Sequence, residues 1–301
     1  MLRPVFQTRS GYCLSPSMIA AIISYLLALP LARGQSGNTD NVEMLACENG
    51  TFGELGLIDA GAILISGNAG FLLITDCASK TSVAITPVGE CSVKVGRDVS
   101  VAAAPIGTPS PTTPVFSYLD VGPGIVISGP QSELKLNRSV SGPVTTYDGR
   151  IDKPALPFLV AGHYEVSVPG GRDIAAFRAG FDFTPLALTS PASQTNLSSQ
   201  KPLTVTWSGG EFMPGDLFAN IILANSTDTF TASCRLADGN SGSYTFPDAV
   251  WTRIPSSLFS LSSVTVQVAG STLKTLSVPE LEKGLRVRIP QASSVFYFTL
   301  F

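Results

Sequence analysis

The chain contains a single histidine, His163, which limits the kinds of catalysis that the sequence can support. A Ser-His-Asp or Cys-His site would have to use this residue, because the imidazole acts as the general base. His163 follows Gly162 at the expected start of a strand, and the chain has no Gly-x-Ser-x-Gly motif. We therefore expect His163 to lie at a strand end or turn, and we predict no catalytic residue.

Pairs of carboxylates offer a second chemistry, the hydrolysis of glycosidic bonds. This reaction needs two acids roughly 5–10 Å apart across a cleft. Glu165 and Asp173 flank one expected hairpin, and Glu211 and Asp216 flank another. A chain with 22 acidic residues contains such pairs by chance. A secreted glycoside hydrolase-like enzyme is therefore the third of our three hypotheses for the function.

The segment DGNSG, from Asp238 to Gly242, has some features of a calcium-binding loop. The EF-hand pattern requires a glutamate eleven positions after the first aspartate, but Ala249 occupies that position. The cysteine spacings also lack the C-x-x-C pair that is typical of zinc sites. We expect a glycine-rich turn at this segment, and we predict no metal site and no cofactor.

Two tryptophans are candidates for an aromatic platform that stacks on a sugar ring. Trp207 alternates in phase with Leu203 and Val205, which predicts a core position. Trp251 lies beside Arg253 in an irregular stretch, so it is the better candidate for an exposed platform. A carbohydrate-binding face would need further aromatic side chains in the same plane, and the candidates are Tyr147, Tyr164 and Tyr244.

The first 34 residues have the pattern of a secretory signal peptide. Arg3 and Arg9 precede a 14-residue apolar run, Met18–Leu31, and Ala32–Gly34 provides small residues for cleavage before Gln35. An alternative is that the apolar run is retained as an anchor, although it is shorter than the roughly 20 residues that span a bilayer. We expect cleavage near Gly34, secretion or display at the cell surface, and no membrane span in the mature chain.

The composition of the remaining residues excludes some classes of partner. The leader holds three of the 19 Lys and Arg residues, which leaves 16 basic against 22 acidic residues and a net charge of about −6. The chain also lacks a basic cluster, so we expect no nucleic-acid partner. The sequence leaves the partner open, and a polysaccharide or a cell-envelope protein is the candidate that export suggests.

The cysteines that remain after the leader suggest two disulfides, because an even number in an exported protein favours pairing. They are Cys47, Cys77, Cys91 and Cys234. We predict Cys77–Cys91, since both residues flank the β-rich run 81–86, and Cys47–Cys234 then follows. Cys234 as a buried free thiol is the alternative to the second bridge.

Alternating residues and glycine or proline turns predict an all-β fold with two antiparallel sandwich domains. Strict alternation marks the strands Tyr164–Val168, Leu203–Trp207, Val264–Val268 and Leu285–Ile289. Turns are predicted at Gly67-Asn68, Gly70 and Asp148-Gly149, and a short helical or irregular crossing at Pro247–Leu261. The last run, Val295–Phe301, is expected to be internal or well covered, because a bare edge of that composition would aggregate.

A polar joint at 188–202 separates the two predicted domains, residues 35–186 and 187–301. Four prolines in the segment 105–114 predict an extended connector inside the first domain. This segment is either a link between strands or a true linker, in which case residues 35–104 would form a small domain of their own.

Several segments resemble exported proteins of acidobacterial type with immunoglobulin-like β-sandwich domains. The shared marks are G-x-Y-x-V, then GG-x-D and a Phe, within residues 161–183, and L-T-V-x-W-x-G-G within residues 202–210. The resemblance covers about residues 115–260. It implies immunoglobulin-like domains and export, and it implies no activity and no catalytic residue.

These observations lead to three hypotheses for the function. The first is a secreted or cell-surface structural or adhesive protein without enzymatic activity. The second is a carbohydrate-binding module, which requires the exposed aromatic platform at Trp251. The third is the glycoside hydrolase-like enzyme, which requires acidic residues that converge in a cleft.

Overall fold

The structure is a computed structural model that describes residues 49–76, 86–96, 115–191, 202–226, 228–259 and 262–299. These residues form strands almost throughout, which confirms the predicted all-β class. The predicted signal peptide, the connector at 105–114, Cys47 and Cys77 lie outside the described residues. Among the described residues, no helix is long and apolar enough to cross a membrane.

Sixteen strands and two short helices follow one another along the described chain. The first nine strands are β1 (Gly50–Asp59), β2 (Leu64–Asp76), β3 (Cys91–Val95), β4 (Val115–Tyr118), β5 (Gly124–Ser128), β6 (Glu133–Ser141), β7 (Val144–Asp152), β8 (Gly162–Val168) and β9 (Phe177–Phe183). The remaining elements are β10 (Ala187–Ser190), β11 (Thr204–Ser208), β12 (Leu217–Ala224), β13 (Thr229–Arg235), β14 (Ser243–Thr245), α3 (Asp248–Trp251), the 3₁₀ helix η2 (Ser256–Phe259), β15 (Ser262–Val278) and β16 (Leu281–Thr299).

Thirteen strands form one continuous sheet, and three form a second. The order in the large sheet is β3-β13-β12-β15-β16-β1-β2-β7-β6-β5-β8-β9, with β4 paired to β2 beside this path. The small sheet has the order β10-β11-β14. All pairs are antiparallel except β1 with β16, which run parallel from Gly53–Leu285 to Gly56–Arg288.

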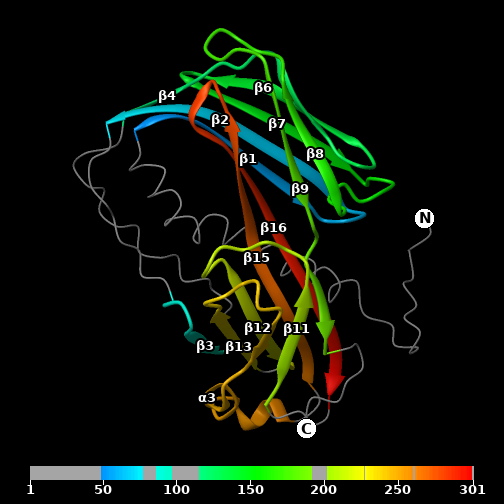
Figure 1. Cartoon of the computed structure of the whole chain (residues 1–301). Coiled ribbons are helices and arrows are strands. Elements are labelled where there is room, and N and C mark those ends of the chain that lie inside the picture. The colour runs from blue at the N-terminus through cyan, green and yellow to red at the C-terminus, as the bar shows by residue number, and fades with distance from the viewer. Residues whose placement is uncertain are drawn as a thin grey trace.

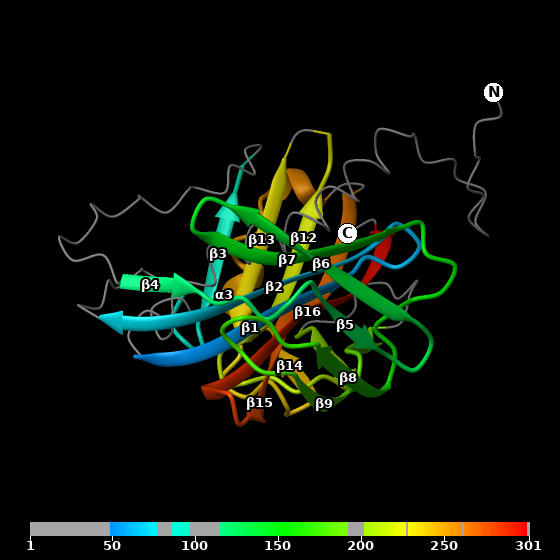
Figure 2. The ribbon, with the colours of Figure 1, turned by 90° about the horizontal axis from the view of Figure 1, so that it is seen from above.

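The sheets enclose two large hydrophobic cores, which give the molecule two bodies (Figure 1). The first body contains β1, β2 and β5–β9, and its core includes Phe71, Tyr147 and Tyr164. The second body contains β3 and β11–β14, and its core includes Trp207 and Trp251. Seen from above, the strands of the first body run across those of the second (Figure 2).

The hairpin β15–β16 belongs to both bodies. Near its base, Val264 and Val266 lie in the second core, and near its tip, Leu285 and Val287 lie in the first core. Its two strands stay paired from Ser262–Thr299 to Val278–Leu281, with one irregularity near the tip. Figure 1 shows β15 and β16 running from the lower body into the upper one.

The two cores do not follow the predicted division at residue 186. Strand β3, from the first predicted domain, pairs with β13 and packs against the second core through Cys91 and Val93. The tip of the β15–β16 hairpin, from the second predicted domain, packs in the first core. A polar joint in the sequence marks a change of core, but it carries no information about pairing between distant strands.

The predicted crossing at Pro247–Leu261 is confirmed, because α3 and η2 both fall within it. The final run is less covered than expected. Within the described residues, positions 293–299 of β16 pair with β15 alone, and Phe296 is 44% exposed.

Candidate functional site

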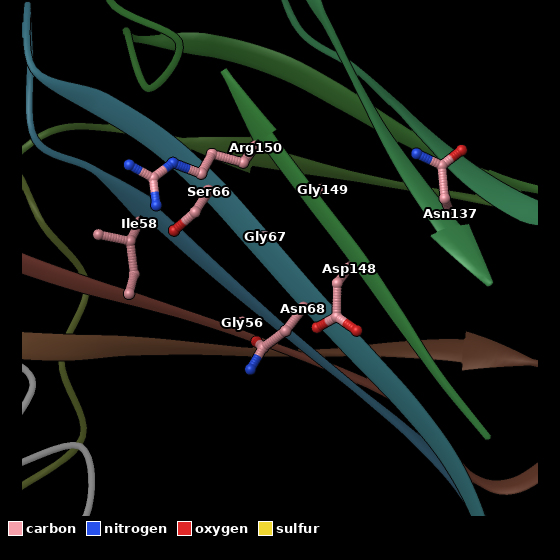
Figure 3. A pocket seen from close by; sticks show the side chains of 9 residues that line it. All are labelled: Gly56, Ile58, Ser66, Gly67, Asn68, Asn137, Asp148, Gly149 and Arg150. Carbon is pink, nitrogen blue, oxygen red and sulfur yellow. The ribbon is translucent and has the colours of Figure 1, made fainter. Parts of the chain in front are cut away.

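A groove of about 400 Å³ lies on the outer face of the first body. Strands β1, β2, β7 and β6 supply its lining (Figure 3). The lining residues are Gly56, Ile58, Ser66, Gly67, Asn68, Asn137, Asp148, Gly149 and Arg150. Apart from Ile58, every side chain among them is polar, so the lining carries several groups that can form hydrogen bonds.

Strand register places the central polar residues in one row across the sheet. Gly56 of β1 is paired with Asn68 of β2, Asn68 with Asp148 of β7, and Asp148 with Asn137 of β6. Neighbouring strands lie roughly 4.8 Å apart, so successive members of the row are spaced by about that distance. Figure 3 shows the side chains of Asn68 and Asp148 close together at the centre of the groove.

A second row lies beside the first, two residues along each strand. Ile58 of β1 is paired with Ser66 of β2, and Ser66 with Arg150 of β7. Arg150 Nε donates a hydrogen bond to Asp152 Oδ1 at 2.6 Å. A guanidinium has five N–H donors, so the terminal amino groups of Arg150 remain available for a ligand.

The glycines explain why the sheet is hollowed at this place. Gly67 of β2 is paired with Gly149 of β7, and both positions face inward. A Cβ atom on Gly67 would lie 2.9 Å from Leu134 Cδ2, and a Cβ atom on Gly149 would collide with the carbonyl of Lys135. Leu134 and Leu136 of β6 therefore pack against the two glycines, where side chains on β2 and β7 would not fit.

The groove offers more hydrogen-bonding groups than it uses internally. Asp148 Oδ2 accepts a hydrogen bond from Thr146 Oγ1 at 3.0 Å, and the carboxylate remains exposed. The amides of Asn68 and Asn137 are exposed, and neither forms a hydrogen bond with any other described residue. In the described part of the chain, no group of three or more His, Cys, Asp and Glu side chains is placed to hold a metal ion.

The surroundings of His163 do not match those of a catalytic base. Its Nδ1 atom is 2.9 Å from Asp182 Oδ1, and the two side chains are 66% and 85% exposed. The ring lies over Gly180, where a Cβ atom would be 2.7 Å from His163 Nε2. His163 and Asp182 thus form a cross-strand hydrogen-bonded pair on the surface of β8 and β9.

The paired acids that we considered are held by separate local partners. Glu165 forms an ion pair with Arg178 at 3.4 Å, and Glu211 forms one with Lys274. Asp173 accepts two hydrogen bonds from Arg172 at 2.9 Å and one from the backbone N–H of Asp120. The Arg172 guanidinium and this backbone N–H lower the pKa of the Asp173 carboxyl to about 2. The contact between Asp173 and Asp120 connects the β8–β9 loop to the β4–β5 loop.

The prediction of an exposed aromatic platform at Trp251 is wrong. Trp251 lies in α3, is only 6% exposed and belongs to the second core. The irregular stretch around it folds inward as a short helix, so its indole is covered. Tyr147 and Tyr164 are fully buried, and Tyr244 packs edge-on against Phe246. Trp207 is 5% exposed, as predicted.

The predicted disulfide pairing is also wrong. Cys91 is bonded to Cys234, which excludes both Cys77–Cys91 and Cys47–Cys234. The physical reason is the strand register, which places Cys91 of β3 directly opposite Cys234 of β13. The two residues are 143 positions apart in the sequence, so nothing local predicts this contact.

Sequence reasoning missed the groove because it interpreted its glycines as turns. The predicted breaks at Gly67-Asn68 and Gly70 lie inside the continuous strand β2. The predicted turn at Asp148-Gly149 lies inside β7. A glycine inside a strand pattern can also mark a close approach of another backbone, and this was the signal in the sequence that could have revealed the groove.

Comparisons of the chain with protein-family models, with curated proteins and with solved structures find no match.

Proposed function

We propose that this protein is a structural or adhesive protein without enzymatic activity, which acts outside the cytoplasm. The β15–β16 hairpin carries this proposal, because its two strands continue without a break from one hydrophobic core into the other. A load on one body would therefore pass to the other through paired backbone strands. A flexible linker could not transmit the load in this way.

Two observations support the location. The N-terminal residues have the charge and hydropathy pattern of a secretory signal. The Cys91–Cys234 bridge is of the kind that persists in oxidising compartments and is rare in the cytosol.

The immunoglobulin-like description of the fold is part of the same proposal. The second body supports it best, because the β10-β11-β14 sheet shares a core with strands β12, β13 and β15 of the large sheet. Sandwiches of this kind commonly serve as spacers and binding modules. The groove over β1, β2 and β7 supplies the recognition surface that an adhesive role needs.

The proposal is tested by the location and the thiol state of the native protein. Cells are fractionated, labelled with a membrane-impermeant amine reagent, and lysed in the presence of a thiol-alkylating reagent. We expect labelled protein in the surface or culture fraction, with Cys91 and Cys234 protected from alkylation until a reductant is added. Recovery of unlabelled protein in the cytosol, with both thiols alkylated directly, would overturn the proposal.

Adhesion is then measured with beads that carry the purified protein. The beads should bind to cells or cell envelopes of the source organism more than beads that carry an unrelated β-sandwich protein. Equal binding by both kinds of bead would reject the adhesive role and leave a structural one.

A further inference from the structure

We propose that the groove binds a neutral, hydroxyl-rich glycan chain that lies across strands β1, β2, β7 and β6. This inference rests on the proposed function, because it names the ligand of the recognition surface described there. The row Gly56, Asn68, Asp148 and Asn137 defines the direction of the ligand.

The types of side chain in the row match the chemistry of sugar hydroxyls. A hydroxyl both donates and accepts hydrogen bonds, the Asp148 carboxylate only accepts, and the amides of Asn68 and Asn137 do both. A carboxylate can accept from two neighbouring hydroxyls at once, and an amide beside it can donate to the same sugar. Because the two amides have no hydrogen-bond partner among the described residues, a ligand that binds them breaks no hydrogen bond of theirs.

The spacing of the row favours a chain over a single sugar. Adjacent strands lie about 4.8 Å apart, which is close to the length of one pyranose ring along a linear glycan. Successive strands can therefore contact successive sugar units. The absence of a side chain at Gly56, at the β1 end of the row, leaves room for the Asn68 amide, which lies over it.

Charge favours a neutral ligand. Asp148 is exposed at the centre of the row, and its carboxylate repels carboxylated or sulfated sugars. Arg150, the cation among the lining residues, lies in the second row and is paired with Asp152 at 2.6 Å, so its remaining N–H groups can serve as hydrogen-bond donors to hydroxyls. With about six more acidic than basic residues after the leader, the chain as a whole adds to this repulsion.

Gly56 provides a steric probe of the groove, with a matched control on the next strand. A Cβ atom on Gly56 would collide with Oδ1 of Asn68, whereas a Cβ atom on Gly70 meets nothing within 4 Å. Both glycines lie within strands, and neither has a positive φ. Gly56→Ala should therefore displace the Asn68 amide, and Gly70→Ala should leave the groove unchanged.

The test is the binding of the purified protein to soluble glycans, measured by affinity electrophoresis and by calorimetry. The panel contains neutral linear glucans, mannans and xylans, with alginate and pectate as acidic glycans and an extended polar peptide as the non-sugar probe. We expect at least one neutral glycan to bind. Asp148→Ala and Gly56→Ala should each weaken its binding by about tenfold, and Gly70→Ala should change it less than about twofold.

Each outcome decides the proposal, provided that every variant has the circular dichroism spectrum of the wild type. A failure of all neutral glycans to bind, a preference for the acidic glycans or the peptide, or unchanged binding by Asp148→Ala would overturn the glycan site. If Gly56→Ala proves unfolded, Asn68→Ala serves in its place with the same expected loss.

The two proposals fail separately. If the protein is found at the surface with its disulfide formed but binds no glycan, this inference fails and the structural or adhesive role remains. If the protein is found in the cytosol with reduced cysteines, the proposed function fails regardless of the result of the glycan-binding test.

Discussion

Tyr147 shows how one buried hydroxyl organises a loop in the first core. Its ring is fully buried and packs edge-on against Phe71, with the ring centroids 6.1 Å apart. Its hydroxyl accepts a hydrogen bond from the backbone N–H of Val121 at 2.9 Å and donates to Asp120 Oδ1 at 3.4 Å. Burial raises the pKa of the Tyr147 phenol above its ordinary value, so the hydroxyl keeps its proton at neutral pH.

Tyr147→Phe should destabilise the protein, because it leaves the buried N–H of Val121 without an acceptor. An unsatisfied buried donor of this kind costs about 1–3 kcal/mol. Urea unfolding of the variant and the wild type measures this difference. Tyr244→Phe is the matched control, since its hydroxyl contacts only Cys91 Sγ, at 3.4 Å, in the described part of the chain. An equal effect of both substitutions would contradict the assignment.

Asp173 should make the stability depend on pH in the acid range. Its folded-state pKa is lowered to about 2 from an ordinary value of 3.8. A lowered pKa means that the stabilising contribution is complete above about pH 4 and is lost as the pH falls through about 2. Because the site is near the surface, we expect Asp173→Asn to cost only about 1 kcal/mol at pH 7.

This difference between Asp173→Asn and the wild type should be much smaller at pH 2 than at pH 7. Thermal unfolding at pH 7 and at pH 2 gives both values. A difference of the same size at the two pH values would show that the negative charge of Asp173 does not contribute.

At the scale of the elements, β3 depends on its disulfide more than on its packing. Its five residues are half-buried or exposed, and β13 is the strand with which it pairs. The bridge between Cys91 and Cys234 closes a loop of about 143 residues. In the chain-entropy treatment, a loop of this length stabilises the folded state by about 5 kcal/mol, and measured values are commonly lower.

Replacing both cysteines by alanine should therefore lower the free energy of unfolding by about 2–5 kcal/mol. Limited proteolysis of the variant should also cut near β3, while the wild type resists cleavage there. Wild-type protein treated with a reductant should behave like the variant. Unchanged resistance in both samples would show that strand pairing alone holds β3.

The elements also show what the sequence could predict and what it could not. Strict alternation predicted parts of β8, β11, β15 and β16, because alternate residues of each strand lie in a core. The opposite face of β15 is not fully open to solvent as expected, since Gln267 is buried and accepts a hydrogen bond from Asn220. The glycines of β2 and β7 misled the prediction, since their function is to let Leu134 and Leu136 pack beneath them. That requirement exists only once distant strands are paired, and the same applies to Cys91 and Cys234.

At the scale of the whole molecule, the shared hairpin should make the two bodies unfold together. Side chains of β16 strengthen the connection, because Gln291 Oε1 accepts from the N–H of Leu186 at 2.6 Å and Ser293 Oγ accepts from the N–H of Leu188 at 2.8 Å. Losing either core would leave half of β15–β16 without its covering layer. We therefore expect a single cooperative transition.

The chain's two tryptophans provide the measurement, since both lie in the second core. Leu285→Ala is in the first core and Leu223→Ala in the second, and each buried leucine should cost about 2–5 kcal/mol. If the bodies unfold together, both variants shift the midpoint of the tryptophan fluorescence transition to a similar degree. A shift with Leu223→Ala alone would indicate independent unfolding.

The parallel pairing of β1 with β16 also has a consequence for synthesis. The ribosome makes β1 long before β16, at about 5–20 residues per second. Of the described strands, β16 emerges last, yet it lines the first core through Leu285 and Val287 and borders the second through Val295. Neither core can close before β16 has been made. If the protein is exported as proposed, the chain would therefore stay without closed cores until β16 has emerged.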